Sequence, residues 1–389
     1  MRMKKICFVT TVSVTLKAFV LKTAEYLHQN GGYDISFICD EDDDFAASLP
    51  DYIRFYPIPM KRGISLGGIG AMRKMRKIFK REKFDLVQYS TPNASLYASM
   101  AAKSAHIPVR LYCQWGMAYV GFGGIKRKIF KLIEKTVCRL STWIEPDSYG
   151  NLYFCREEGL YSEKKSSVVN KGSASGVSLE LFDVTKKTEF RKEIRTSQNI
   201  PSDAFVCGFV GRVTRDKGIN ELLAVIKMLL ETHKDIYFLI IGGNDKEDTL
   251  DAGLFEWSKR QKQVKYCGAT NQVPQYMAAM DCYVMPSYRE GFGLTVVEAG
   301  AMALPVICTD IPGPTDAISD GVNGVLVKKK NADELAAAIL RLYLDRNLAE
   351  KLGAAGLENV RENYEQTALF GYILKDRERL LREAENKRK

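Results

Sequence analysis

Two carboxylates, Glu290 and Glu298, lie eight residues apart in the segment MPSYREGFGLTVVEAGAMALP, which reads as a buried strand, a glycine-bearing loop and a helix. Glu290 falls in the loop, and Glu298 about one turn into the expected helix. A carboxylate accepts hydrogen bonds from two neighbouring hydroxyls. Free amides at a helix start can hold phosphate oxygens, and Gly291 and Gly293 permit a close backbone approach. A strand, loop and helix that carried two surface glutamates without a function would show the same spacing.

A second segment, GFVGRVTRDKG, places cations after another apolar strand. The strand ends at Gly211, the loop carries Arg212, Arg215 and Lys217, and a helix opens near Ile219. Cations beside exposed backbone amides suit a diphosphate. A strand-to-helix loop with solvated charges has the same appearance, so only a fold that brings the two segments together makes them a site.

The elements that must position these residues alternate between strand and helix. Strands are expected at 4–10, 33–39, 85–89, 109–113, 143–146, 205–210, 237–241, 264–266, 282–285 and 305–308. Helices are expected at 16–29, 70–80, 94–105, 124–140, 219–231, 273–279, 294–303, 332–344 and 366–388, and Ser13 and Thr15 are candidate N-caps of the first. This alternation predicts two tandem α/β units with parallel sheets, whose ligands bind outside the carboxyl ends of the strands.

Composition sets limits on the class of protein. The 389 residues suffice for two domains, and 46% hydrophobic with 27% charged residues is typical of a globular chain. No stretch approaches the roughly 20 apolar residues of a membrane span. The nine cysteines are scattered without a C-x-x-C pair, and the chain has three histidines. This pattern favours a reducing compartment and argues against a zinc site.

Taken together, these segments resemble the retaining glycosyltransferases of family 4. The resemblance rests on GRVTRDKG, PSYREGFGLTVVEA and ALPVICTDIPGPTDAISDGVNGVLV, and extends to NKGSASGV and IPMKRGISLGG. It implies the GT-B fold, in which two Rossmann-like parallel-sheet domains face each other across a cleft. We expect an acceptor-binding domain at 1–168, onto which the C-terminal helix 366–389 packs back, and a donor-binding domain at 169–365. Within the family, the chain looks most like enzymes that build bacterial capsule, exopolysaccharide or O-antigen units.

The resemblance also implies roles for individual residues. Arg212 and Lys217 match the pair that binds the donor diphosphate, Glu298 the residue that holds the ribose, and Glu290 the residue that contacts the donor sugar. The remaining donor-side positions match segments that contact the sugar and phosphates or against which the base packs. They are Gly211, Phe292, Gly293, Leu294, Thr295, Gly268, Thr270 and Val273. No essential metal or cofactor is implied, and the nucleotide sugar, by family habit a UDP-sugar, is a substrate.

Two departures from the family pattern affect the first domain and its boundary. Many relatives carry a histidine near the donor sugar where this chain has Trp115, within Cys-Gln-Trp-Gly, and an indole cannot accept a proton. Many also have Gly-Val-Asp where this chain has Gly176-Val177-Ser178. On the acceptor side, position alone suggests that Ser13, Thr15 and Lys17 line the cleft.

A formal net charge of +10 is concentrated partly in the first domain. The stretch 61–81 holds eight Lys/Arg and no acid, with Met72, Met75, Ile78 and Phe79 on one helical face, and KRKIFK at 126–131 adds four more cations. Such surfaces fit anionic lipid, although a solvated face over a core helix has the same pattern. The family implies a polyprenyl diphosphate-linked acceptor, so we expect a cytoplasmic enzyme bound peripherally at the inner membrane face.

Other functions make different demands on the sequence. A sugar-nucleotide epimerase of GT-B architecture would keep the donor site but would also need acids and a histidine around the sugar. The histidines of this chain, His28, His106 and His233, are poorly placed for that role. A basic nucleic-acid-binding protein would need a recognition motif, and an oxidoreductase a G-x-G-x-x-G turn; neither is present. The acid run DEDDD at 40–44 resembles a metal-binding D-x-D site but reads as a solvated loop.

Overall fold

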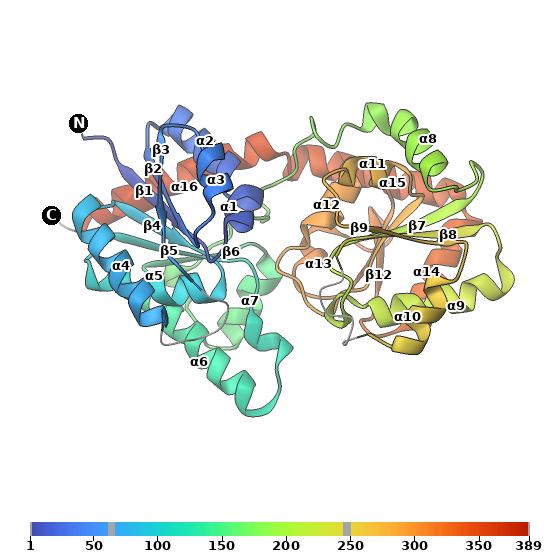
Figure 1. The fold of residues 1–389 in the computed structure, drawn as a ribbon, viewed down its shortest axis with the longest axis horizontal. Helices are drawn as coiled ribbons and strands as arrows, with labels where there is room; N and C mark the ends of the chain where they lie inside the picture. Colours follow the sequence, from blue (N-terminus) through green and yellow to red (C-terminus); the bar gives the residue numbers. More distant parts are fainter. Residues whose placement is uncertain (1, 61–66, 244–249, 388–389) are drawn as a thin grey trace. The chain divides into compact units, whose positions relative to one another are not determined.

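The computed structural model describes residues 2–60, 67–243 and 250–387, which divide into two compact units. Unit 1 comprises Met1–Ser175 together with Thr367–Lys389, and unit 2 comprises Gly176–Gln366. Each unit is built on a six-stranded sheet in which all strand pairs are parallel (Figure 1). The predicted α/β class with two parallel sheets is therefore confirmed.

The sheet of unit 1 has the strand order β3-β2-β1-β4-β5-β6. Its strands are β1 (Lys5–Val9), β2 (Asp34–Cys39), β3 (Ile53–Pro57), β4 (Leu86–Tyr89), β5 (Val109–Gln114) and β6 (Trp143–Pro146). Its helices are α1 (Ser13–Phe19), α2 (Leu21–Gly31), α3 (Asp43–Ser48), α4 (Gly67–Glu82), α5 (Pro92–Ser104), α6 (Gly124–Leu140), α7 (Tyr149–Glu157) and, at the end of the chain, α16 (Gln366–Asn386).

Alternation along β1 shows why both faces of this sheet are covered. Ile6 and Phe8 pack into a cluster with residues of α1, α2 and α16, whereas Cys7 and Val9 pack with residues of α4, α5 and α6 on the other face. Successive side chains of a strand point to opposite faces, so a strand that is apolar at every position requires helices on both sides.

Unit 2 repeats the same topology, with the order β12-β11-β10-β7-β8-β9. Its strands are β7 (Phe205–Val210), β8 (Ile236–Ile241), β9 (Val264–Gly268), β10 (Cys282–Met285), β11 (Val306–Thr309) and β12 (Gly324–Val327). Its helices are α8 (Lys187–Ser197), α9 (Ile219–Thr232), α10 (Ala252–Lys259), α11 (Val273–Ala278), α12 (Leu294–Ala301), α13 (Pro314–Ala317), α14 (Ala332–Leu344) and α15 (Arg346–Asn363). One buried cluster joins α9, α10 and α14 to the sheet, and the other joins α8, α11 and α12.

The boundary between the units falls at Ser175 and Gly176, seven residues beyond the expected end of the first domain at 168. The segment before it belongs to unit 1, where the Ser173 amide donates to the Asp147 carbonyl at 2.7 Å. Val177 belongs to unit 2, because its amide donates to the Tyr364 carbonyl at 2.8 Å. Gly176 has a φ of +64°, and a Cβ there would lie 2.9 Å from the Tyr364 carbonyl oxygen, so the crossing requires glycine.

The first expected helix, 16–29, is two helices in the structure. α1 ends at Phe19 and α2 begins at Leu21, with Val20 between them at φ −119° and ψ −40°. The N-cap expectation was also wrong: Val12 precedes α1 without a side-chain cap, and Ser13 is its first residue. Among the described residues, no helix combines the length and apolar character that a membrane span requires.

Candidate active site

The two chemistry-bearing loops of unit 2 emerge from neighbouring strands. β10 pairs with β7 in parallel, with Cys282 opposite Cys207 and Tyr283 opposite Gly208. At this pair the chain order of the sheet reverses, because β8 and β9 lie to one side of β7 while β11 and β12 lie beyond β10. Ligands of doubly wound sheets bind at such a switch point, outside the carboxyl ends of the strands.

Backbone contacts hold the two loops against each other. Gly218 has a φ of +73°, and a Cβ there would lie 1.9 Å from the Pro286 carbonyl oxygen. The Tyr288 amide donates to the Asp216 carbonyl at 2.9 Å. The Thr309 hydroxyl, at the end of β11, donates to the Ser287 carbonyl at 2.6 Å. The loops therefore form one scaffold, which requires glycine at position 218.

Charged side chains gather on this scaffold. Lys217 Nζ lies 2.6 Å from Glu290 Oε1, across 73 residues of sequence. Asp216 lies 3.2 Å from the Arg289 guanidinium and 3.7 Å from that of Arg212. Of the residues that the sequence singled out, Lys217 and Glu290 are thus in contact. Arg212 is linked through Asp216 to Arg289, the neighbour of Glu290 in sequence. Sequence reasoning missed Asp216 and Arg289, although each lies beside a residue it had named.

Asp216 stays ionised between these cations. Burial acts to raise its pKa, but the hydrogen bond from the Thr214 hydroxyl and the charges of Arg289 and Arg212 outweigh burial and lower the pKa. The Thr214 oxygen lies 2.6 Å from Asp216 Oδ1. Asp216 is therefore an anion to which both the Arg212 and Arg289 side chains pair.

The second carboxylate, Glu298, lies on α12. The N-cap of this helix is Gly293, at φ +84°, and no side chain caps the helix start. The Val296 amide donates to the Gly293 carbonyl at 2.9 Å, and the earlier amides of a helix are the groups that suit an anionic ligand. The Thr295 hydroxyl accepts a hydrogen bond from the Tyr283 hydroxyl at 2.7 Å. Phe292 is buried against Tyr364, with ring centroids 5.3 Å apart, so only its backbone is offered to the site.

Glu298 is half-buried, and burial raises the pKa of its carboxyl to about 7. Its charged form lacks the solvation that water would give it. Hydroxyl groups that donated hydrogen bonds to this carboxylate would restore part of that solvation, so the position favours a polar ligand.

The residues expected to contact the base lie at the same edge of this sheet. The Gly242 amide, after β8, donates to the carbonyl of Gly268, the last residue of β9, at 2.8 Å. A Cβ on Gly242 would lie 1.8 Å from the Gly211 carbonyl oxygen, so the ends of β7, β8 and β9 approach closely. The Thr270 hydroxyl accepts from the Gln272 amide at 3.1 Å, and Val273 begins α11.

Unit 1 holds the expected acceptor-side residues, after β1 and β5. The Ser13 hydroxyl donates to Asp42 Oδ2 at 2.5 Å, Thr15 is half-buried, and Lys17 is exposed. Trp115 lies against Phe19 of α1, with ring centroids 5.7 Å apart. The structure therefore brings Trp115 to the same helix as Ser13, Thr15 and Lys17. The expected cleft between the two units stays a prediction.

Thr91, which sequence reasoning missed, has a strained backbone beside this group. It follows β4, which neighbours β1, and its φ of +69° is unusual for a β-branched residue. Its hydroxyl oxygen accepts from the Thr11 amide at 3.0 Å and lies 2.8 Å from the Thr11 hydroxyl. Thr91 thus ties the ends of β1 and β4 together at the switch point of unit 1.

A buried polar network fixes the strand end that precedes Trp115. Gln114 donates to Glu134 Oε1 at 2.5 Å and accepts from the Tyr161 hydroxyl at 2.9 Å. Tyr112 also donates to Glu134 Oε1, at 2.7 Å. Burial raises the pKa of Glu134, although the hydrogen bonds from Tyr112 and Gln114 oppose the shift. The network leaves Trp115 on a rigid support.

The acid run at 40–44 begins a helix. The Asp42 carboxylate accepts from the Phe45 amide at 2.9 Å and caps α3. The hydrogen bonds from Ser13 and from the Phe45 amide lower the pKa of Asp42. Across the described residues, no three His, Cys, Asp or Glu side chains are grouped to hold a metal ion.

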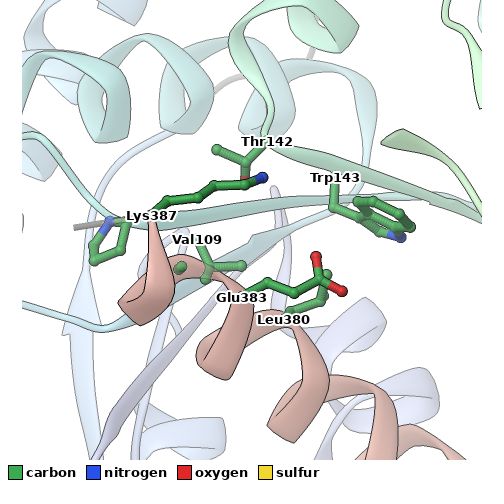
Figure 2. A pocket seen from close by; sticks show the side chains of 8 residues that line it. Val109, Thr142, Trp143, Leu380, Glu383 and Lys387 are labelled. Atoms are coloured by element: carbon green, nitrogen blue, oxygen red, sulfur yellow. The ribbon is translucent and has the colours of Figure 1, made fainter. Parts of the chain in front are cut away.

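One hollow of unit 1 lies away from the carboxyl ends of the strands. Figure 2 shows Val109, Thr142 and Trp143, at the starts of β5 and β6, facing Leu380 and Glu383 of α16. Val109 and Trp143 open their strands, so this hollow is at the amino edge of the sheet. It belongs to the packing of α16 and not to the site.

Two family models match the chain, one in each half. Residues 5–145 match "Glycosyl transferase 4-like", and residues 190–359 match "Glycosyl transferases group 1". The capsular polysaccharide biosynthesis glycosyltransferase CapM of Staphylococcus aureus is 29% identical over 85% of this chain and 86% of that protein. An Escherichia coli enzyme, UDP-Gal:alpha-D-GlcNAc-diphosphoundecaprenol alpha-1,3-galactosyltransferase, is 26% identical over 82% of each chain.

Solved structures share the fold over nearly the whole chain. HepE of Anabaena in complex with UDP and glucose has a TM-score of 0.80 at 18% identity, covering 96% of this chain and 99% of that one. Sucrose-phosphate synthase of Thermosynechococcus elongatus has a TM-score of 0.79 at 20% identity, covering 97% and 99%.

Proposed function

This chain belongs to the glycosyltransferases of family 4 and the GT-B fold, and we propose that it moves a hexose or N-acetylhexosamine from a UDP-sugar to a lipid-linked saccharide with retention of configuration. The main support for this proposal is the scaffold at the β7–β10 switch point, where Lys217 lies 2.6 Å from Glu290. This scaffold supplies cations for a diphosphate and a carboxylate for a sugar.

In the proposed reaction the anomeric C–O bond breaks, and negative charge develops on the departing diphosphate. Arg212, Lys217 and the first amides of α12 would stabilise that charge more in the transition state than in the ground state. Glu290 would orient the sugar, and Glu298 would hold the ribose. The acceptor hydroxyl would attack from the face that the diphosphate leaves and pass its proton to the phosphate, so no enzymic nucleophile is needed. We expect no resident metal, because these groups carry the leaving-group charge.

The acceptor and the pathway are proposed from the relatives. The E. coli relative is named for UDP-Gal and a diphosphoundecaprenol acceptor, and a Campylobacter jejuni relative, 25% identical, is named for a diphospho-undecaprenol acceptor. The S. aureus relative is named for capsular polysaccharide biosynthesis. These names support a role in bacterial surface polysaccharide synthesis. We propose that the enzyme works at the cytoplasmic face of the membrane that holds such lipids.

A donor screen tests the proposed activity. Purified enzyme is incubated with UDP-, GDP-, ADP- and dTDP-sugars and with membranes that carry lipid-linked saccharides, and released nucleoside diphosphate is measured. We expect release that depends on the acceptor and is fastest with a UDP-sugar. Conversion of the sugar nucleotide without any acceptor would instead favour the epimerase alternative, and no acceptor-dependent release with any donor would contradict the transferase.

Glu298 should make nucleotide affinity depend on pH. Burial raises the pKa of its carboxyl to about 7, and the carboxyl must be ionised to accept hydrogen bonds from two ribose hydroxyls. Below about pH 7, binding therefore releases a proton, and affinity for UDP should fall by up to about tenfold per pH unit; above it, affinity should level off. Calorimetric titration across this range measures the slope. In Glu298→Gln only the phosphate of UDP titrates, so matching slopes in the two proteins would refute the assignment.

We propose that α6, and not α4, makes the contact with an anionic membrane. On α4, Met75 and Phe79 are buried, and Met72 and Ile78 pack against the same core, so this apolar face faces inward. Lys61 and Arg62 of the expected basic stretch lie outside the described residues. On α6, by contrast, exposed apolar and basic side chains alternate on one face; they are Ile125, Lys128, Ile129, Leu132, Lys135 and Arg139.

Vesicle co-sedimentation should depend on this face of α6. Ile129 and Leu132 are 52% and 67% exposed, and replacing both with serine should weaken binding to vesicles of anionic phospholipid roughly tenfold, because less apolar surface is buried in the lipid. As a matched control, Val322→Ser and Leu344→Ser remove apolar side chains that are 62% and 76% exposed on unit 2, and these should leave binding unchanged. Equal binding to neutral vesicles would refute the proposal.

A further inference from the structure

The Lys217–Glu290 ion pair occupies the place where a nucleotide phosphate is proposed to bind. Its 2.6 Å contact joins side chains that are only 20% and 12% exposed, so the pair is largely shielded from water, where opposite charges attract more strongly than at the surface. Tyr288 and Asp216 hold the two loops in register through a backbone hydrogen bond of 2.9 Å. The pair is therefore built into the scaffold of the site.

Glu290 and a phosphate are both anions, and they compete for the same ammonium group. A nucleotide that uses Lys217 must first separate it from Glu290. The released carboxylate then lies partly buried near a second negative charge, and hydrogen bonds from a donor sugar would stabilise it there. A donor sugar brings hydroxyl groups to that position, whereas a nucleoside diphosphate without a sugar brings none.

We propose that Glu290 is an internal substitute for phosphate, which makes the site prefer the nucleotide sugar over the nucleoside diphosphate product. This inference rests on the proposed donor site. In the free enzyme Lys217 is held by Glu290. When the donor binds, Lys217 turns to the diphosphate and Glu290 accepts hydrogen bonds from the sugar. Once the sugar has been transferred, Glu290 competes for Lys217 again and displaces the product.

The Glu290→Gln variant gives the inference a sharp test, because glutamine keeps the shape and removes the charge. Calorimetric titration should show that UDP binds roughly three- to tenfold more tightly to the variant than to the wild type, since the competing anion and its repulsion are gone. The UDP-sugar should bind no more tightly than to the wild type. The preference for donor over product is then reduced or reversed, and UDP becomes a stronger product inhibitor.

Two comparisons isolate the pair from a general change in charge. Glu221 accepts a hydrogen bond from the Tyr288 hydroxyl at 2.7 Å, so this contact is with a neutral group and not with a lysine. Glu221→Gln should therefore leave UDP affinity unchanged. When Lys217 is already replaced by methionine, adding Glu290→Gln should change UDP affinity little, because the lysine for which the two anions compete is absent.

The outcomes separate this inference from the proposed function. If the wild type binds none of UDP, GDP, ADP or dTDP, the donor site is refuted and the inference falls with it. If the wild type binds UDP but Glu290→Gln binds it equally or more weakly, the donor site stands and the inference is overturned. Equal tightening in Glu221→Gln would also overturn it, since the effect would then be one of net charge.

Discussion

Replacing Lys217 with methionine is expected to lower kcat/KM for sugar transfer by about two to three orders of magnitude. Lys217 closes the short turn that follows β7, and its ammonium group lies 2.6 Å from Glu290 at the switch point of unit 2. The proposed transition state places additional negative charge on the departing diphosphate, so a cation fixed beside it lowers the barrier. Initial rates of nucleoside diphosphate release at saturating acceptor measure the effect.

A matched lysine on the same unit serves as the control. Lys259 pairs with Glu256 at 2.9 Å and is well exposed on α10, so Lys259→Met should keep its activity within about twofold. Thermal unfolding and circular dichroism show whether Lys217→Met still folds. A folded variant that loses less than fivefold in kcat/KM would remove Lys217 from the proposed mechanism.

Replacing Arg377 with methionine is expected to lower the free energy of unfolding by about 3–5 kcal/mol. Arg377 is 1% exposed, and its guanidinium donates to Glu145 Oε1 at 2.9 Å and to Gln88 Oε1 at 3.1 Å. Through these bonds α16 is fastened to the ends of β4 and β6 within unit 1. Burial acts to lower the pKa of Arg377, but the charge of Glu145 outweighs it, and the pKa is raised. Without the arginine, the Glu145 carboxylate loses its cation in a nearly dry position.

Urea unfolding followed by circular dichroism measures this loss, with a neighbour on the same helix as the control. Arg379 is about one-third exposed and pairs with Asp376 and Glu383, so Arg379→Met should cost no more than about 1 kcal/mol. Adding Glu145→Gln to Arg377→Met should restore part of the stability, because the buried charge is then removed. A loss for Arg377→Met as small as that for Arg379→Met would contradict a structural role of the buried pair.

The sequence identified all eight central strands and two of the four edge strands, β6 and β9. A strand buried on both faces is apolar at nearly every position, as β8 is, and this pattern is visible without a structure. The other two edge strands, β3 and β12, were not predicted. β3 has one buried residue, Ile53, and β12 has only four residues. An edge strand is covered on fewer sides and shows less of the pattern.

The break between α1 and α2 was missed for a different reason. Leu16, Val20, Ala24 and Leu27 are all buried, and their spacing fits one continuous helix. The backbone departs from the helix at Val20 alone, and no proline or glycine marks the position.

For the site, the sequence by itself determined the residue types and the elements on which they lie. Strand–loop–helix patterns placed Arg212 and Lys217 after one strand, and Glu290 and Glu298 after another. Local hydrophobic periodicity and loop composition are enough for this, because they depend on neighbours along the chain.

Only the tertiary structure decided which of these residues meet. Lys217 and Glu290 are 73 residues apart and touch because β7 and β10 are adjacent strands. The contact between Asp216 and Arg289 has the same origin: it also joins residues 73 positions apart, and no local sequence pattern indicates it. Strand order and register depend on the packing of both sheet faces and not on any one segment. The sequence therefore specifies the site's chemical groups, and the fold specifies their pairing.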